Sequence, residues 1–141
     1  MITEKAKHMS LKGILNGQTV AEFASARKEY FVSIGYTDEH AILDSLTPSF
    51  LLVMENLPPI TREIVHHLVM TKQNLSDFVT TNYLSKKMRE PSKVVSVYCK
   101  SLFDIGMVER QKVSKGYEYK ISSEVFFDWF LMRYGRKHTR S

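Results

Sequence analysis

Few residues of this chain have the spacing that catalysis or metal binding requires. His66 and His67 are adjacent, so on a helix they would point about 100° apart and could not share one metal as an i, i+4 pair does. We expect one of them to lie at the boundary of the core. Cys99, the single cysteine, falls on the apolar side of a predicted helix, which favours a buried, unreactive thiol. The sequence therefore predicts no catalytic residue, no metal and no cofactor.

Basic residues, in contrast, are concentrated in one part of the chain. The formal net charge is +5, but residues 86–120 contain nine Lys and Arg against four Asp and Glu. Residues 1–60 contain five basic residues against seven acidic ones. A segregated basic excess favours a polyanionic partner, and a merely solvated surface is the alternative.

A predicted helix at 91–105 would present several of these cations on one face. On a helical wheel at about 100° per residue, Val95, Cys99 and Leu102 cluster as the apolar side. The opposite face carries Lys93, Val97, Lys100 and Asp104, with Ser96 and Ser101 at its edges. Its lysines and serines can bind phosphates, and its valine can touch a thymine methyl group. That face has no Arg, Asn or Gln for bidentate recognition of a base, so we expect weak discrimination between DNA sequences.

The DNA-binding residues that we predict combine this face with the basic residues before and after it. They are Lys86, Lys87 and Arg89 ahead of the helix; Ser92, Lys93, Ser96, Val97 and Lys100 on it; and Arg110, Lys112 and Lys115 in the hairpin that follows. Double-stranded DNA is the partner expected of such a set. The same surface used for docking a protein is the alternative.

The elements that would position these residues follow Pro58 and Pro59. Thr61 opens a helix, Asn74 or Ser76 caps a short second one, and Pro91 and Gly106 bound the third. Residues 107–113 and 116–121 read as two strands of a hairpin, and Ser122 or Ser123 caps a last, apolar helix. This order predicts a mostly α (α+β) chain with a winged helix-turn-helix fold.

Three further helices are predicted ahead of that unit. Thr19, Thr37 or Asp38, and Thr47 are their expected N-caps, and Pro48 occupies the first position of the third helix. We therefore divide the chain into an N-terminal helical segment at 1–57, a winged-helix domain at 58–135 and a basic tail at 136–141. The first ten or so residues are expected to be disordered or derived from a tag.

Several segments of the chain resemble the C-terminal winged helix of archaeal-type AAA+ ATPases. They are LPPITREIV at 57–65, the region from Val95 to DIGMVER at 104–110, GYEYKIS at 116–122 and the aromatic run SEVFFDWFL at 123–131. The resemblance covers roughly residues 42–134. It implies that the preceding helices correspond to part of the helical lid of such an ATPase, and that the chain serves as a regulator or as an accessory or C-terminal module of a DNA-processing ATPase.

The chain departs from that family where the nucleotide would bind. A phosphate-binding loop needs the pattern GxxxxGK[ST], but GILNG at 13–17 has the wrong spacing and is not followed by Lys. No site for nucleotide hydrolysis can be assembled from these residues. Several roles of the chain are therefore compatible with the sequence: a detached piece of an ATPase, a stand-alone relative, a replication or transposition accessory, or a transcription regulator.

The aromatic helix near the C-terminus carries more large side chains than one helix face can bury. We expect Trp129 in the core, and Phe126 or Phe130 against the N-terminal helices, a second subunit of a homodimer or a missing ATPase core. The longest apolar run, at 50–54, is far too short to span a bilayer, and residues 1–8 are too polar for a signal peptide. We therefore expect a cytoplasmic protein.

Overall fold

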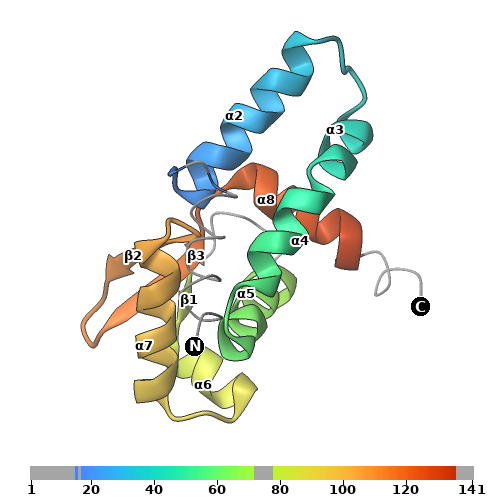
Figure 1. Ribbon diagram of the computed structural model, residues 1–141. Coiled ribbons are helices and arrows are strands. Elements are labelled where there is room, and N and C mark those ends of the chain that lie inside the picture. The colour runs from blue at the N-terminus through green and yellow to red at the C-terminus, as the bar shows by residue number, and fades with distance from the viewer. Residues whose placement is uncertain (1–14, 16, 72–77, 136–141) are drawn as a thin grey trace, which may run out of the picture.

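The computed structural model describes residues 15, 17–71 and 78–135 (Figure 1). Its helices are α2 (Val20–Ser33), α3 (Glu39–Ser45), α4 (Thr47–Glu55), α5 (Pro59–Thr71), α6 (Thr81–Met88), α7 (Ser92–Asp104), α8 (Glu124–Phe130) and the π-helical turn η1 (Leu131–Gly135). Its strands are β1 (Val79–Thr80), β2 (Val108–Lys112) and β3 (Tyr117–Ile121). None of the described helices is long and apolar enough to cross a membrane. The predicted tag-derived start and basic tail lie outside the described residues.

A small antiparallel sheet accompanies the helices. β3 is the central strand, paired with β2 as a hairpin and with β1 on its other edge. From α5 onward the order is helix, strand, two helices and hairpin, which is the order of a winged helix-turn-helix. The expected class, mostly α with a small sheet and an N-terminal helical extension, is confirmed.

The start of the second helix of this unit differs from the prediction. Asn74 and Ser76, the expected caps, lie outside the described residues, and Val79 belongs to strand β1 rather than to a helix. Helix α6 begins only after Thr80, whose hydroxyl accepts a hydrogen bond of 3.1 Å from the backbone amide of Tyr83. Valine and threonine favour extended backbone, and Val79 pairs with Tyr119 of β3.

The end of α7 is fixed by Gly106, as predicted. Its φ of +75° is in the left-handed region that favours glycine, and the amide of Met107 donates to the carbonyl of Leu102 at 3.0 Å. A Cβ on Gly106 would lie 2.3 Å from the Cβ of Thr19, just before α2. Gly106 therefore both ends the helix and lets the N-terminal segment approach it.

Helix α8 joins the N-terminal helices to the winged helix in one core. Trp129 is fully buried, as predicted, and its ring lies 5.1 Å from that of Phe50 in α4. Phe126 is 5.2 Å from the same ring, so the expectation that it reaches the N-terminal helices is confirmed. Phe130 is also buried, against Tyr134 at 4.6 Å. The aromatic rings that might have faced a second subunit or an ATPase core are thus enclosed within this chain.

The start of α4 shows a second difference from the prediction. Thr47 is not the N-cap: it is the first residue of the helix, and Leu46 precedes it without a side-chain cap. The hydroxyl of Thr47 instead accepts a hydrogen bond of 2.9 Å from the indole nitrogen of Trp129. A buried indole N–H requires an acceptor, and Thr47 supplies it across the core.

Candidate nucleic-acid interface

The outward face of α7 is open to solvent. Lys93, Ser96, Val97 and Lys100 are all exposed along it. The described part of the N-terminal segment contacts the chain at the C-terminal end of α7, where the amide of Val20 donates to the carbonyl of Ile105 at 3.2 Å. In Figure 1, α2 and α3 project from the end of the molecule opposite to the α6–α7 turn. No described part of the chain covers the face that was predicted to enter a groove.

The inward face of α7 packs in the core. Val95, Cys99 and Leu102 are buried, as the helical wheel predicts. Burial raises the pKa of the Cys99 thiol to about 12, so the thiol stays protonated at neutral pH. The amphipathic division of α7 therefore leaves only its polar face for a ligand.

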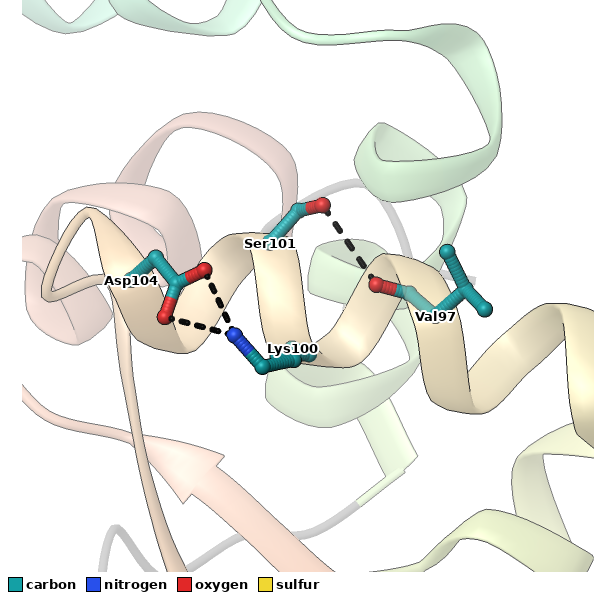
Figure 2. A network of polar contacts seen from close by, with 4 residues as sticks. All are labelled: Val97, Lys100, Ser101 and Asp104. Carbon is teal, nitrogen blue, oxygen red and sulfur yellow. Dashed lines mark hydrogen bonds and ion pairs between the residues drawn. The ribbon is translucent and has the colours of Figure 1, made fainter.

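The C-terminal half of that polar face has internal partners (Figure 2). The Nζ of Lys100 forms an ion pair with Asp104 at 3.1 Å, and the hydroxyl of Ser101 donates to the carbonyl of Val97 at 3.4 Å. The carboxylate of Asp104 offsets the charge of Lys100 and would repel a phosphate. A polyanion is therefore favoured at the N-terminal half of α7, around Lys93 and Ser96.

Arg110 does not project as a free cation. Its guanidinium carbon lies 4.2 Å from the ring centroid of Phe103, in α7, and 4.2 Å from that of Tyr117, in β3. The guanidinium is therefore within cation–π distance of two aromatic rings, and the residue is half-buried. Arg110, predicted as a phosphate contact, thus also links α7 to the hairpin.

An open concavity of about 590 Å³ lies between the hairpin tip and the first turns of α6 and α7. Hydroxyl, amide and ammonium groups line it, from Thr80, Asn82, Ser92, Ser96, Lys115 and Tyr117. Such groups bind the sugar and phosphate of nucleic acids. The concavity brings Ser92 and Ser96 of the predicted set together with Lys115, whereas Lys86, Lys87 and Arg89 are not among the residues that line it.

The prediction missed the residues that α6 contributes to this concavity. Thr80, Thr81 and Asn82 were assigned to the interior of a helix that in fact begins at Thr81. The run of β-branched residues at 79–81 is the signal that could have placed the helix start there. Thr81 also fixes the geometry, because its hydroxyl donates to the carbonyl of Tyr117 in the hairpin at 3.1 Å.

Three predicted cations lie at the end of α6 and in the turn to α7. Lys86, Lys87 and Arg89 are exposed, and the ammonium of Lys87 lies 5.7 Å from the ring centroid of Tyr83. Arg89 has φ 58° and ψ 42°, a left-handed conformation that costs a non-glycine residue about 1–2 kcal/mol. Lys112 and Lys115 are exposed in the hairpin. The predicted cations thus lie on both sides of the uncovered α7 face.

Among the described residues, no three His, Cys, Asp or Glu side chains are grouped as metal ligands would be. His67 is half-buried, as expected of a boundary histidine, and its ring lies 5.9 Å from that of His66.

Comparison with protein-family models, curated proteins and solved structures gives no match to this chain. The likeness to the AAA+ C-terminal region stays a prediction from the sequence pattern.

Proposed function

We propose that this chain binds double-stranded DNA through its winged helix, with low sequence discrimination. The N-terminal half of α7 would lie in the major groove and the hairpin tip beside the adjacent backbone. The observation that carries the proposal is the uncovered polar face of α7, which has exposed cations on either side and the hydroxyl-lined concavity at its start. In the cell, such a chain would act as a regulator or as a module of a DNA-processing ATPase.

The electrostatics support a phosphate backbone as the ligand. Six exposed cations flank or occupy this face: Lys86, Lys87, Arg89, Lys93, Lys112 and Lys115. None of the six forms a salt bridge with another described residue, in contrast to Lys100. Unpaired ammonium and guanidinium groups release counterions from DNA when they meet phosphates, and that release supplies affinity without sequence recognition.

The chemistry of the face argues against strong base selectivity. Its exposed side chains are Lys, Ser, Val and Asp104, whereas bidentate recognition of guanine or adenine uses Arg, Asn or Gln. Arg110, which follows α7 in the sequence, has its guanidinium carbon 4.2 Å from the ring centroids of both Phe103 and Tyr117. Binding is therefore expected to be dominated by phosphate contacts.

A charge reversal on the groove helix tests the proposal. Lys93→Glu should weaken binding to a random-sequence duplex by about ten-fold or more, because it removes one phosphate contact and adds a repulsive charge. Arg133→Glu makes the same change of charge at an exposed position of η1, outside the proposed interface, and serves as the control. Fluorescence anisotropy measures both. Equal affinity of the two variants would contradict the proposed interface.

A protein-docking role is the second candidate, and one observation favours it. Tyr30, Val32, Ile34 and Tyr36 are exposed together at the end of α2 and in the turn after it, with Tyr30 and Ile34 each 54% exposed. Clustered apolar side chains on a surface often mark a protein contact. The double substitution Tyr30→Ser with Ile34→Ser separates the two functions, since it should leave DNA affinity unchanged and abolish a docking contact made by this end of the molecule.

A further inference from the structure

Val97 is an apolar side chain at the centre of the polar face of α7. It is 59% exposed, the highest value among the large exposed hydrophobic residues. Phe103, the other exposed apolar side chain of this helix, is covered on one face by Arg110. Val97 has no such partner among the described residues, so its methyl groups face solvent in the free protein.

The neighbours of Val97 allow a ligand to approach it closely. Residues three and four positions away share a helix face, which places Lys93 one turn before Val97 and Ser101 one turn after. Serine at 96 and at 101 is too short to shield the valine. Figure 2 shows the ammonium of Lys100 directed to Asp104 and away from Val97, so the lysine stem leaves the valine uncovered.

The chemical groups at the edges of the base pairs determine which contact Val97 can make. In the major groove, the 5-methyl group of thymine is the apolar group that the base pairs present, and the other groups are hydrogen-bond donors and acceptors. Uracil lacks that methyl group, and the deep, narrow major groove of A-form RNA does not admit side chains.

We propose that Val97 contacts the thymine 5-methyl group, so that the chain prefers thymine-containing duplex DNA to the same duplex without the methyl groups and to RNA. This inference rests on the proposed DNA binding and adds one selective contact to it. The lysines around Val97 would hold the helix against the backbone, and the valine would supply the preference for A·T pairs.

Replacement of thymine by deoxyuridine removes only the methyl group and keeps the base pairing. Two duplexes of one A·T-rich sequence, with thymine or with deoxyuridine throughout, are titrated with the full chain in fluorescence anisotropy. Wild type should bind the deoxyuridine duplex about four-fold more weakly, as expected when one methyl contact is lost. Val97→Ala should show a smaller difference between the two duplexes, because alanine keeps only one methyl group and it lies farther from the bases. Alanine favours a helix at this exposed position, so the variant should fold.

Lys93→Ala is the matched control on the same face. It should weaken binding to both duplexes and keep their ratio, because it removes a phosphate contact and not the methyl contact. Equal binding of wild type to the two duplexes would overturn the role of Val97 while leaving DNA binding in place. A methyl preference that is undiminished in Val97→Ala would also overturn it. Binding to neither duplex would overturn the inference together with the function on which it rests.

Discussion

Single residues hold the N-terminal segment against the winged helix, and Gly106 is the clearest case. It has a φ of +75°, and its missing side chain makes room for Thr19. Gly116, at the hairpin tip, has a φ of +89°, but a Cβ added there would have no other atom within 4 Å. Both glycines therefore have a positive φ, but only at Gly106 would an added Cβ meet another side chain.

Gly106→Ala should lower the free energy of unfolding by about 2–4 kcal/mol, which combines left-handed strain with overpacking against Thr19. Gly116→Ala carries the strain alone, so its loss should be about 1 kcal/mol. Urea unfolding measures both. Similar losses in the two variants would show that the contact between Thr19 and Gly106 contributes little.

Asp128 in α8 is a carboxylate whose pKa is raised in the folded state, so its protonation affects the free energy of unfolding. Burial is the main cause that raises its pKa above the ordinary value of 3.8, followed by the charges of Glu124 and Glu39, and Lys28 opposes the shift. The folded state therefore keeps this proton to a higher pH than the unfolded state. The contribution of Asp128 to stability is most favourable below its ordinary pKa and falls as the pH rises through the raised one.

Asp128→Asn should raise the Tm near neutral pH, because the amide has no charge to desolvate. The gain should shrink as the pH falls toward the ordinary pKa of 3.8, where the wild-type carboxyl is itself neutral. Asp44→Asn, at an exposed position of α3, is the control. Thermal unfolding followed by circular dichroism across this range tests it. A gain that does not depend on pH would rule out the proton as its cause.

At the scale of elements, Arg110 sets the position of the hairpin relative to helix α7. Its guanidinium joins Phe103 of α7 to Tyr117 of β3, and Thr81 joins α6 to the same strand. The first link joins residues seven positions apart, whereas the second joins Thr81 to the backbone of Tyr117, 36 positions along the chain. The hairpin tip and the α7 face can act on one ligand only if their relative position is maintained.

Arg110→Met keeps an unbranched apolar stem and removes the planar charged group. It should cost about 1–2 kcal/mol of stability, since two cation–π contacts are lost, and it should weaken DNA binding. Arg110→Lys keeps the charge but not the planar group, so it should restore binding only in part. Urea unfolding and anisotropy give the two readouts. Full recovery of binding in Arg110→Lys would show that Arg110 acts as a simple phosphate contact.

The helices and the hairpin could be predicted from local pattern, because caps, glycines and apolar spacing are local signals. Ser123 caps α8 and Gly106 ends α7 as expected. Strand β1 could not be predicted in this way, since its two residues are strand only through pairing with β3, about 40 positions along the chain. Thr47 was misassigned for a similar reason, because its partner is Trp129.

The residues of the candidate site likewise fall into two groups, those that local pattern predicts and those that depend on contacts between elements. Exposure of Lys93, Ser96 and Val97 follows from helical spacing and was predicted correctly. The stacking of Arg110 between two rings depends on where α7 and the hairpin meet, so the sequence pattern did not indicate it. The charge and the amphipathic face of a helix can be read from one segment, whereas the contacts of Arg110 depend on how two elements meet.

At the scale of the whole molecule, α8 is packed against α4 while no described residue covers the outward face of α7. The ring of Trp129 packs on Phe50 and donates to Thr47, which joins α8 to α4. Helices α2 and α3 lie at the end of the molecule opposite to the α6–α7 turn (Figure 1). A ligand that binds the cations beside α7 would meet a surface already in place, so no rearrangement of the N-terminal segment is required.

The salt dependence of binding to a random-sequence duplex tests this account most directly. If the six exposed cations meet phosphates, the logarithm of the association constant should fall against the logarithm of salt concentration with a slope of about −5. Substitution of both Lys112 and Lys115 by Ala should make that slope shallower by about 2 and leave the Tm nearly unchanged, because exposed charges add little to stability. A flat salt response, or no binding at low salt, would contradict the central claim.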